Sequence, residues 1–218
     1  MKILFFAKAG HWATEQCLEK LKQTGADFVL FKGARNDPFP EINSIEGIDY
    51  VMSFSSQWII PESVLSLARY ASLNFHPGSP EYPGIGCTNF ALYERETAFG
   101  VTCHHMHSKV DTGPIVKVNR FDIYENDSVQ SLTDRCYYHM VILFAEILDQ
   151  IISGKELTGA AEHWARKPFT RHELNELGRI SLNMSADEVQ RRVHAMAFPG
   201  YPGAFIEFQG VRFEAIQS

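Results

Sequence analysis

Residues 72–86 read SLNFHPGSPEYPGIG and place the strongest constraint on what the chain can fold into. The apolar positions Leu73 and Phe75 are typical of the end of a buried strand. Three prolines and three glycines follow within ten residues, and such a segment continues neither as a strand nor as a helix. We therefore expect Asn74 and His76 to lie where a strand leaves a sheet, with their side chains on one face because strand residues alternate.

The opening of the chain alternates between strand and helix patterns, and this order predicts a parallel sheet. Residues 2–7 form a buried apolar run, residues 13–24 have helical spacing, and residues 28–31 form a second apolar run. We predict an α/β, Rossmann-like fold in which a mostly parallel sheet is flanked by helices. Further strands are predicted at 49–54, 71–75, 100–106 and 115–123, and further helices at 62–69, 88–96 and 128–152.

The sequence pattern divides the chain into a larger α/β domain, residues 1–154, and a small C-terminal extension, residues 155–218. The extension holds a predicted helix at 185–196 and a β-hairpin around Gln209. The apolar residues of this hairpin are candidates for a dimer surface, because exposed apolar strands pair readily. They are Phe205, Ile206, Phe208 and Phe213.

Composition is typical of a globular protein in an aqueous, reducing compartment. Of 218 residues, 45% are hydrophobic and 21% charged, and no apolar run approaches the length of a membrane span. The net charge of −6 argues against a nucleic-acid partner, because excess carboxylates repel a polyanion. Four cysteines without paired spacing, and no secretory signal, favour free thiols and a cytoplasmic location.

A third polar residue completes a candidate site with Asn74 and His76. Asp111 lies in the turn KVDTGPI, which follows a strand-like run at 100–110. An asparagine amide donates to a developing oxyanion, a histidine donates a second bond or accepts a proton, and an aspartate tunes the histidine. With no serine or cysteine nucleophile beside them, the three imply direct acyl transfer to a substrate nucleophile. Taken singly, each is more typical of an ordinary turn or a hydrogen-bonded histidine.

Two other groups of polar residues allow both a ligand interpretation and a structural one. The turn after the first strand holds Lys8 and His11, which either face a ligand or belong to an ordinary helix-entry loop. This turn lacks the glycine pattern of a dinucleotide site. His104, His105 and His107 come from one predicted strand, and the last two share a face. No fourth ligand with a recognisable spacing accompanies them, so no metal site is predicted.

The ordered set NFHPG, YPGIG, GVTCHHM and VDTGPI resembles the catalytic domain of the formyltransferases that use 10-formyltetrahydrofolate. An N-x-H followed by a later D-x-G is the signature of that family. By this resemblance residues 1–154 are the catalytic domain, and Asn74, His76 and Asp111 are the catalytic trio. The resemblance also implies 10-formyltetrahydrofolate as co-substrate and chemistry that needs no metal.

The resemblance further implies ligand contacts. In the family, the segment after the third strand lines the donor's pteridine pocket, largely through backbone groups, and the loop after the fourth strand borders the acceptor. The donor contacts implied are Ser56, Gln57, Trp58, Ile59 and Asp111. The acceptor contacts implied are Tyr82, Pro83, Gly84 and Ile85, together with Lys8 and His11. Trp58 and Ile59 are also compatible with simple packing under the sheet.

Within the family, the chain looks most like the sugar-nucleotide N-formyltransferases, which formylate amino sugars destined for surface polysaccharide such as lipopolysaccharide O-antigen. The β-barrel that follows the catalytic domain of methionyl-tRNA formyltransferase is missing, and the net charge is acidic. A nucleotide-sugar acceptor is therefore expected, with no nucleic-acid or membrane partner, and a homodimer through the C-terminal extension. The alternatives are formyl transfer to methionyl-tRNA or another small amine, hydrolysis of the formyl donor, and a folate-binding module without activity.

Overall fold

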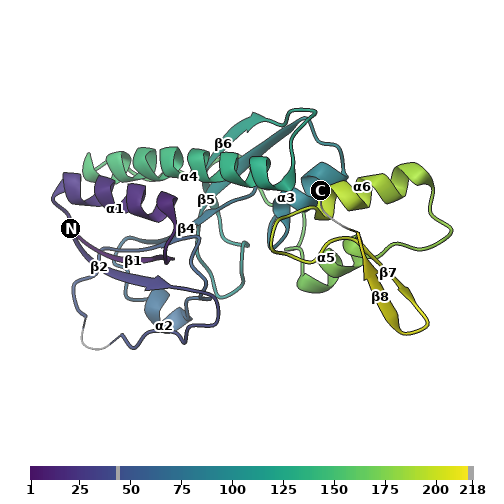
Figure 1. The fold of residues 1–218 in the computed structure, drawn as a ribbon. Coiled ribbons are helices and arrows are strands. Elements are labelled where there is room, and N and C mark those ends of the chain that lie inside the picture. The colour runs from purple at the N-terminus through teal and green to yellow at the C-terminus, as the bar shows by residue number, and fades with distance from the viewer. Residues whose placement is uncertain (43–44, 216–218) are drawn as a thin grey trace.

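The computed structural model of the chain describes residues 1–42 and 45–215, and Figure 1 shows its arrangement. Within these residues one sheet has the strand order β2-β1-β3-β4-β5-β6, and β7 pairs separately with β8. The strands are β1 (Lys2–Lys8), β2 (Asp27–Gly33), β3 (Tyr50–Phe54), β4 (Ala71–His76), β5 (Ala98–His105), β6 (Ile115–Asp122), β7 (Phe205–Phe208) and β8 (Val211–Glu214). The helices are α1 (Trp12–Thr24), α2 (Glu62–Leu65), α3 (Cys87–Tyr93), α4 (Val129–Ile152), α5 (Arg171–Gly178) and α6 (Ala186–Met196). The predicted Rossmann-like α/β fold with a C-terminal hairpin is confirmed.

Strand direction places two polar residues side by side. β1 pairs in parallel with β2 and β3, and β3 pairs in parallel with β4. β5 pairs antiparallel with both β4 and β6. In the β4–β5 pair Asn74 lies opposite His104, and His76 lies opposite Thr102. This register brings Asn74 and His104 together near the carboxyl end of β4, the edge at which open α/β sheets bind ligands.

Both faces of the sheet are buried, as its unbroken apolar strands require. Residues 3–7 of β1 are fully buried. α1 and α4 lie along one face in Figure 1, where the Phe144 ring packs 5.4 Å from Phe5 and 5.1 Å from Phe75 between centroids. Leu65 of α2 belongs to a second apolar cluster on the opposite face. The site-bearing strand β4 is therefore held within a packed core.

The helix predicted at 62–69 is shorter than expected. α2 ends at Leu65, and Arg69 N donates to Ile48 O at 2.9 Å. This bond ties the chain to the segment before β3, so the backbone leaves the helix early in order to enter β4. The other predicted strands and helices are present, and their ends differ from the predictions by at most three residues.

The long helix α4 covers the core. Its buried stripe includes Leu132, Met140 and Ile147, which are 0% exposed. Neither α4 nor any other helix within residues 1–42 and 45–215 is both long enough and apolar enough to cross a membrane.

The C-terminal region returns to the sheet before it forms the hairpin. Ala160 N donates to Ile115 O, and Phe169 N donates to Pro83 O, both at 2.8 Å. α6 then packs against α3, and the β7–β8 hairpin projects at the end of the molecule remote from α1 (Figure 1). Backbone hydrogen bonds therefore cross the division at residue 154, which stays a prediction.

Candidate active site

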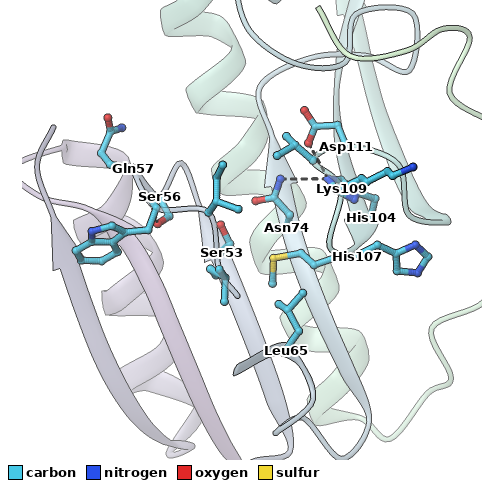
Figure 2. A pocket seen from close by; sticks show the side chains of 14 residues that line it. Ser53, Ser56, Gln57, Leu65, Asn74, His104, His107, Lys109 and Asp111 are labelled. Carbon is cyan, nitrogen blue, oxygen red and sulfur yellow. Dashed lines mark hydrogen bonds and ion pairs between the residues drawn. The ribbon is translucent and has the colours of Figure 1, made fainter. Parts of the chain in front are cut away.

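The carboxyl edge of β4 brings the three predicted polar residues together. Asn74 and His76 lie on β4, and Asp111 lies in the turn between β5 and β6. A fourth residue, His104 of β5, lies between Asn74 and Asp111 (Figure 2). Its Nε2 is 3.1 Å from Asn74 Nδ2 and 3.2 Å from Asp111 Oδ1. Its Nδ1 donates to His105 O at 2.8 Å, which fixes the orientation of the ring.

Asp111 is the centre of a buried polar network. Its Oδ2 lies 3.3 Å from His76 Nδ1 and accepts from Gly84 N at 2.8 Å. Its Oδ1 faces His104 Nε2. The side chains of Asp111, His76 and His104 are at most 5% exposed. Hydrogen bonds are electrostatically stronger in such a region of low dielectric, so the carboxylate is held firmly between two imidazole rings.

The network moves the pKa values of Asp111 and His76 in opposite directions. Burial raises the pKa of Asp111, but the charge of His76 and the hydrogen bond from His104 outweigh it and hold the pKa at about 2. Burial lowers the pKa of His76, but the Asp111 carboxylate outweighs it, with further support from the Cys87 sulfur, and raises the pKa to about 10. His76 and Asp111 therefore form an ion pair at neutral pH.

Both ring nitrogens of His76 are engaged by the protein. Nδ1 faces Asp111, and Nε2 lies 3.0 Å from Tyr82 O. A carbonyl oxygen only accepts, so Nε2 carries a hydrogen and donates it to Tyr82. We expected His76 to donate to an oxyanion or to take up a proton, and both roles need a free nitrogen. This arrangement provides none, and what a protonated His76 offers the site is its positive charge.

The backbone around Asp111 adopts conformations that few residues tolerate. Asp111 itself has a φ of 46°, in the left-handed region. Gly84 has a φ of 91°, and a Cβ there would lie 2.4 Å from Phe169 O. A Cβ at Gly113 would lie 1.9 Å from His105 O. Both turns therefore need glycine for close backbone approach, and the strained Asp111 is typical of a functional position.

One cavity, which we call the Trp58 cavity, opens beside the polar network, between the segment after β3 and the turn after β5 (Figure 2). Its lining residues are Ser53, Ser56, Gln57, Trp58, Ile59, Ile60, Leu65, Asn74, His104, Met106, His107, Lys109, Val110 and Asp111. The structure thus brings the four predicted donor contacts at 56–59 together with Asn74 and Asp111. Trp58 also packs against the apolar cluster under the sheet, and its Nε1 donates to Asp37 O at 3.0 Å.

A second cavity, which we call the Arg171 cavity, shares no lining residue with the first. It is lined by Arg35, Pro77, Ile85, Gly86, Cys87, Thr88, Asn89, Thr133, Tyr137, Arg171, Leu174, Asn175, Met196, Phe198, Tyr201 and Pro202. Two guanidinium groups and two phenol rings stand out in this set. Guanidinium groups bind phosphates through paired hydrogen bonds, and aromatic rings stack on flat ligands, so the lining suits an anionic ligand with a ring.

The predicted acceptor contacts fall partly at this second cavity. Ile85 lines it directly. His11 lies beside it, with its ring 4.1 Å from the Tyr137 ring between centroids, and Lys8 Nζ lies 5.9 Å from the same ring. Lys8 and His11 therefore lie next to Tyr137, although they are not themselves part of the lining.

Tyr82 differs from the expectation. Its side chain is only 3% exposed, and its hydroxyl donates to Glu94 Oε2 at 2.6 Å. The ring packs in the core beside Phe99 and Phe169, so the phenol is turned away from both cavities. The family resemblance predicted that the loop with Tyr82 borders the acceptor. The apolar residues that bury the ring come from distant segments, so the loop sequence alone does not reveal its burial. Only the backbone carbonyl of Tyr82 reaches the polar network, through His76.

Several site residues were not identified from the sequence. His104 was noted only as one of three strand histidines, and its place between Asn74 and Asp111 depends on the β4–β5 register. Arg35, Tyr137 and Arg171 lie in three separate parts of the chain and belong to no local motif. Only the tertiary fold brings them to one cavity, so no signal in a single sequence identifies them.

Cys87 lies beside His76 in the folded chain. A cysteine therefore stands next to the trio, contrary to the interpretation of the sequence. The His76 ring hydrogen-bonds the Cys87 sulfur, and Sγ lies 3.7 Å from Gly84 O. The thiol lines the Arg171 cavity and is absent from the lining of the Trp58 cavity. It therefore faces His76 from a different side than the cavity that exposes the Asn74 amide.

The histidines considered for a metal site face different surroundings, although His105 and His107 also line one cavity together with Met106. His107 lines the Trp58 cavity, whereas His105 borders a cavity at the opposite strand ends with Tyr50 and Tyr70. Within residues 1–42 and 45–215, no group of three or more His, Cys, Asp or Glu side chains is arranged to hold a metal ion. The expectation of metal-free chemistry stays a prediction.

Comparison with known sequences gives a family match over the part of the chain that carries this geometry. Residues 40–148 match the formyl transferase family. GDP-perosamine N-formyltransferase from Brucella melitensis is 29% identical over 181 residues, which cover 81% of this chain and 68% of that protein. The matched region contains β3, β4 and the Asp111 turn, so it includes the whole polar network.

Comparison with solved structures shows the same fold. A sugar N-formyltransferase from Shewanella sp FDAARGOS_354 aligns with a TM-score of 0.81 at 15% identity, covering 99% of this chain and 96% of that one. The N-formyltransferase from Helicobacter canadensis, in complex with folinic acid and dTDP-3-aminofucose, aligns with a TM-score of 0.70 at 17% identity, covering 96% and 85%. Because the sequence identities are this low, these alignments show a shared fold and nothing further.

Proposed function

The chain belongs to the formyl transferase family, and on that premise we propose that it moves a formyl group from 10-formyltetrahydrofolate to the amine of a nucleotide-linked amino sugar. One observation carries the proposal, which is that the Asp111 network connects two chemically different cavities. Asn74 and Asp111 line the Trp58 cavity, while Ile85, one residue from the Gly84 N–H that bonds Asp111, lines the Arg171 cavity. A donor in one cavity and an acceptor in the other meet at this network.

The Trp58 cavity is proposed to hold the folate donor. Its 56–59 segment follows β3 and offers backbone donors and acceptors to a pteridine ring, and Ile59 is 74% exposed and free to cover it. The Helicobacter canadensis protein, which shares the fold, was crystallised with folinic acid, a formylated folate. Because Asn74 lies in the same lining, a formyl group carried by the donor reaches the amide.

The Arg171 cavity is proposed to hold the nucleotide-sugar acceptor. Arg35 and Arg171 suit the two phosphates of a nucleoside diphosphate, because a guanidinium binds phosphate oxygens in pairs. Tyr137 and Tyr201 provide flat surfaces for the base or the sugar. The Brucella relative is named for GDP-perosamine, and the Helicobacter structure contains dTDP-3-aminofucose. Both acceptors are amino sugars on a nucleoside diphosphate, which supports the same substrate class for this chain.

In the proposed reaction the neutral amine attacks the formyl carbon on N10 of the donor, and the formyl oxygen becomes an oxyanion. The Asn74 amide has two N–H groups, and the 3.1 Å contact between its Nδ2 and His104 Nε2 leaves at least one of them for the oxyanion. The positive charge of His76 further stabilises the oxyanion in this buried site. The intermediate then collapses by breaking the bond between the formyl carbon and N10, which takes up a proton and leaves as tetrahydrofolate.

The amine must lose a proton as the new C–N bond forms. His76 has no free nitrogen for it, because Nδ1 faces Asp111 and Nε2 bonds Tyr82 O. The Asp111 carboxylate, directly or through water, is the remaining acceptor among the trio, and it lines the donor cavity. The low pKa of Asp111 makes it a transient carrier that passes the proton on to N10 or to solvent.

We also propose that the chain forms a homodimer through the β7–β8 hairpin. Phe208, Val211 and Phe213 are each more than half exposed on this hairpin, which is a large apolar surface for a projecting element. Replacing Phe208 and Phe213 by serine is expected to yield a monomer in light scattering, with turnover retained. A wild-type chain that is monomeric at all concentrations tested contradicts this part of the proposal.

A turnover screen tests the proposed function. 10-Formyltetrahydrofolate is offered with a panel of nucleotide-linked 3-amino and 4-amino sugars, beside charged initiator tRNA and a control without acceptor. Fast formylation of one sugar supports the proposal and names the acceptor. Formylation of tRNA alone, or equal release of tetrahydrofolate with and without sugar, contradicts it in favour of the tRNA or hydrolase alternatives.

A further inference from the structure

The segment 160–169, which we call the strap, crosses both turns of the polar network. At one end Ala160 N donates to Ile115 O at 2.8 Å, just beyond the turn that carries Asp111. At the other end Phe169 N donates to Pro83 O at 2.8 Å, next to Gly84. The strap therefore joins two turns that are also linked through the Asp111 carboxylate, which accepts from Gly84 N.

The middle of the strap reinforces this connection. Ala165 N donates to Pro80 O at 3.0 Å. Glu162 forms an ion pair with Arg120 of β6, but this pair is exposed and contributes little to stability. The backbone bonds are the firmer part of the strap, because they pair groups at fixed positions on both turns.

The Trp164 side chain of the strap reaches the site itself. Its Nε1 donates to Gly113 O at 2.8 Å, within the Asp111 turn. Its ring meets the His104 ring edge-on at 5.0 Å between centroids, and the His76 ring at 5.9 Å. One half-buried indole therefore contacts the turn of Asp111 and both of the histidines that Asp111 joins.

We infer that Trp164 is a positioning residue, whose indole holds the Asp111 turn in place and keeps the carboxylate between His76 and His104. Two features make the turn dependent on such support. Asp111 is in the left-handed region, which strains the backbone of a residue that has a Cβ. The Gly113 carbonyl that Trp164 binds is two residues from Asp111, so releasing it lets the turn relax and water enter.

Loss of the indole is expected to change the protonation of His76. The groups that face the His76 ring are the Asp111 carboxylate, the Tyr82 carbonyl and the Cys87 sulfur. Burial alone lowers the pKa of His76, and Asp111 is the strongest opposing influence. If the carboxylate moves away, the pKa of His76 falls towards its ordinary value, and the positive charge at the site is lost at lower pH.

The test compares Trp164→Ala and Trp164→Phe with Glu162→Gln, a matched change in the same strap that spares the indole. Titration of His76 is followed by NMR of histidine-labelled protein, assigned with His76→Asn, and the pH profile of kcat is recorded in parallel. Trp164→Ala is expected to lower the His76 midpoint by about one pH unit or more, a tenfold change in protonation. Trp164→Phe keeps a ring but loses the donor, so it is expected to lie between Trp164→Ala and the wild type, and Glu162→Gln is expected to match the wild type.

An unchanged His76 midpoint in folded Trp164→Ala overturns the inference. If that variant does not fold, an unchanged midpoint in Trp164→Phe overturns it equally. The kcat profile rests on the proposed function, but the NMR titration needs no substrate. A lowered midpoint in a protein that formylates nothing therefore upholds the role of Trp164 while contradicting the proposed function.

Discussion

The Trp58 and Arg171 cavities border the same polar network but are built in different ways. The Trp58 cavity is formed mainly by segments that follow the neighbouring strands β3 and β5, and it exposes Asn74 and Asp111. The Arg171 cavity draws its walls from the loop after β4, from α3, α4 and α5, and from the segment after α6. Under the proposed function, a reaction centre on the sheet and a separate acceptor cavity built from helices and loops allow acceptor choice to change without altering the chemistry.

Asp111→Asn is expected to have the largest effect, because it disrupts the polar network that both cavities border. It removes the charge that joins His76, His104 and Gly84 N, and breaking a buried ion pair costs about 3–5 kcal/mol of unfolding free energy. Turnover is expected to collapse as well. Conventional turnover and urea unfolding measurements check both effects.

The same variant tests the pH dependence. The folded pKa of His76 is about 10 against 6.5, so the stability from the ion pair is full below pH 6.5 and is lost as pH rises through about 10. The pKa of Asp111 is about 2 against 3.8, so the contribution is also lost as pH falls through about 2. Asp111→Asn is expected to flatten the alkaline part of the stability curve relative to wild type. An alkaline loss as steep as that of wild type refutes the ion pair.

Asn74→Ala is expected to have the next largest effect and to act on the chemical step alone. Losing one oxyanion donor lowers kcat by about a hundredfold to a thousandfold. Ser72→Ala, on the same strand with its hydroxyl donating to Leu65 O, is the matched control and is expected to keep near-normal turnover. If Asn74→Ala keeps near-normal kcat while folded, the oxyanion role is wrong.

Arg171→Ala separates the two cavities. Removing a charged hydrogen-bond donor to phosphate is expected to raise KM for the acceptor about tenfold to a hundredfold. KM for the folate donor is expected to stay unchanged. Trp58→Ala is the reciprocal variant and is expected to raise KM for the donor only. Equal changes in both KM values in either variant contradict the assignment of ligands to cavities.

Cys87→Ala is expected to have the smallest effect, with turnover close to wild type. The thiol lines the Arg171 cavity, away from the formyl carbon that the Asn74 amide would contact. A large loss of turnover in a folded variant, together with a formyl thioester trapped on wild-type Cys87 and seen by mass spectrometry, would replace direct transfer by a covalent route.

The sequence was sufficient to predict the sheet and the grouping of Asn74, Asp111 and residues 56–59 around one cavity, because each depends on local patterns, and the roles of these residues stay predictions. Apolar runs, the proline and glycine break after Phe75, and the motif around Asp111 all lie within short stretches. The roles of His104 and Trp164 were not accessible, because they depend on a strand register and on a segment about 50 residues from its hydrogen-bond partner Gly113. The burial of Tyr82 was missed for the same reason.

The most direct test of the central claim is the fate of the formyl group. Wild-type protein is incubated with isotopically labelled 10-formyltetrahydrofolate and the preferred amino-sugar nucleotide, and both products are quantified by mass spectrometry. The account predicts one formylated sugar for each tetrahydrofolate released, with both products almost absent for Asn74→Ala. Release of tetrahydrofolate together with free formate, without formylated sugar, or undiminished transfer by Asn74→Ala, contradicts it.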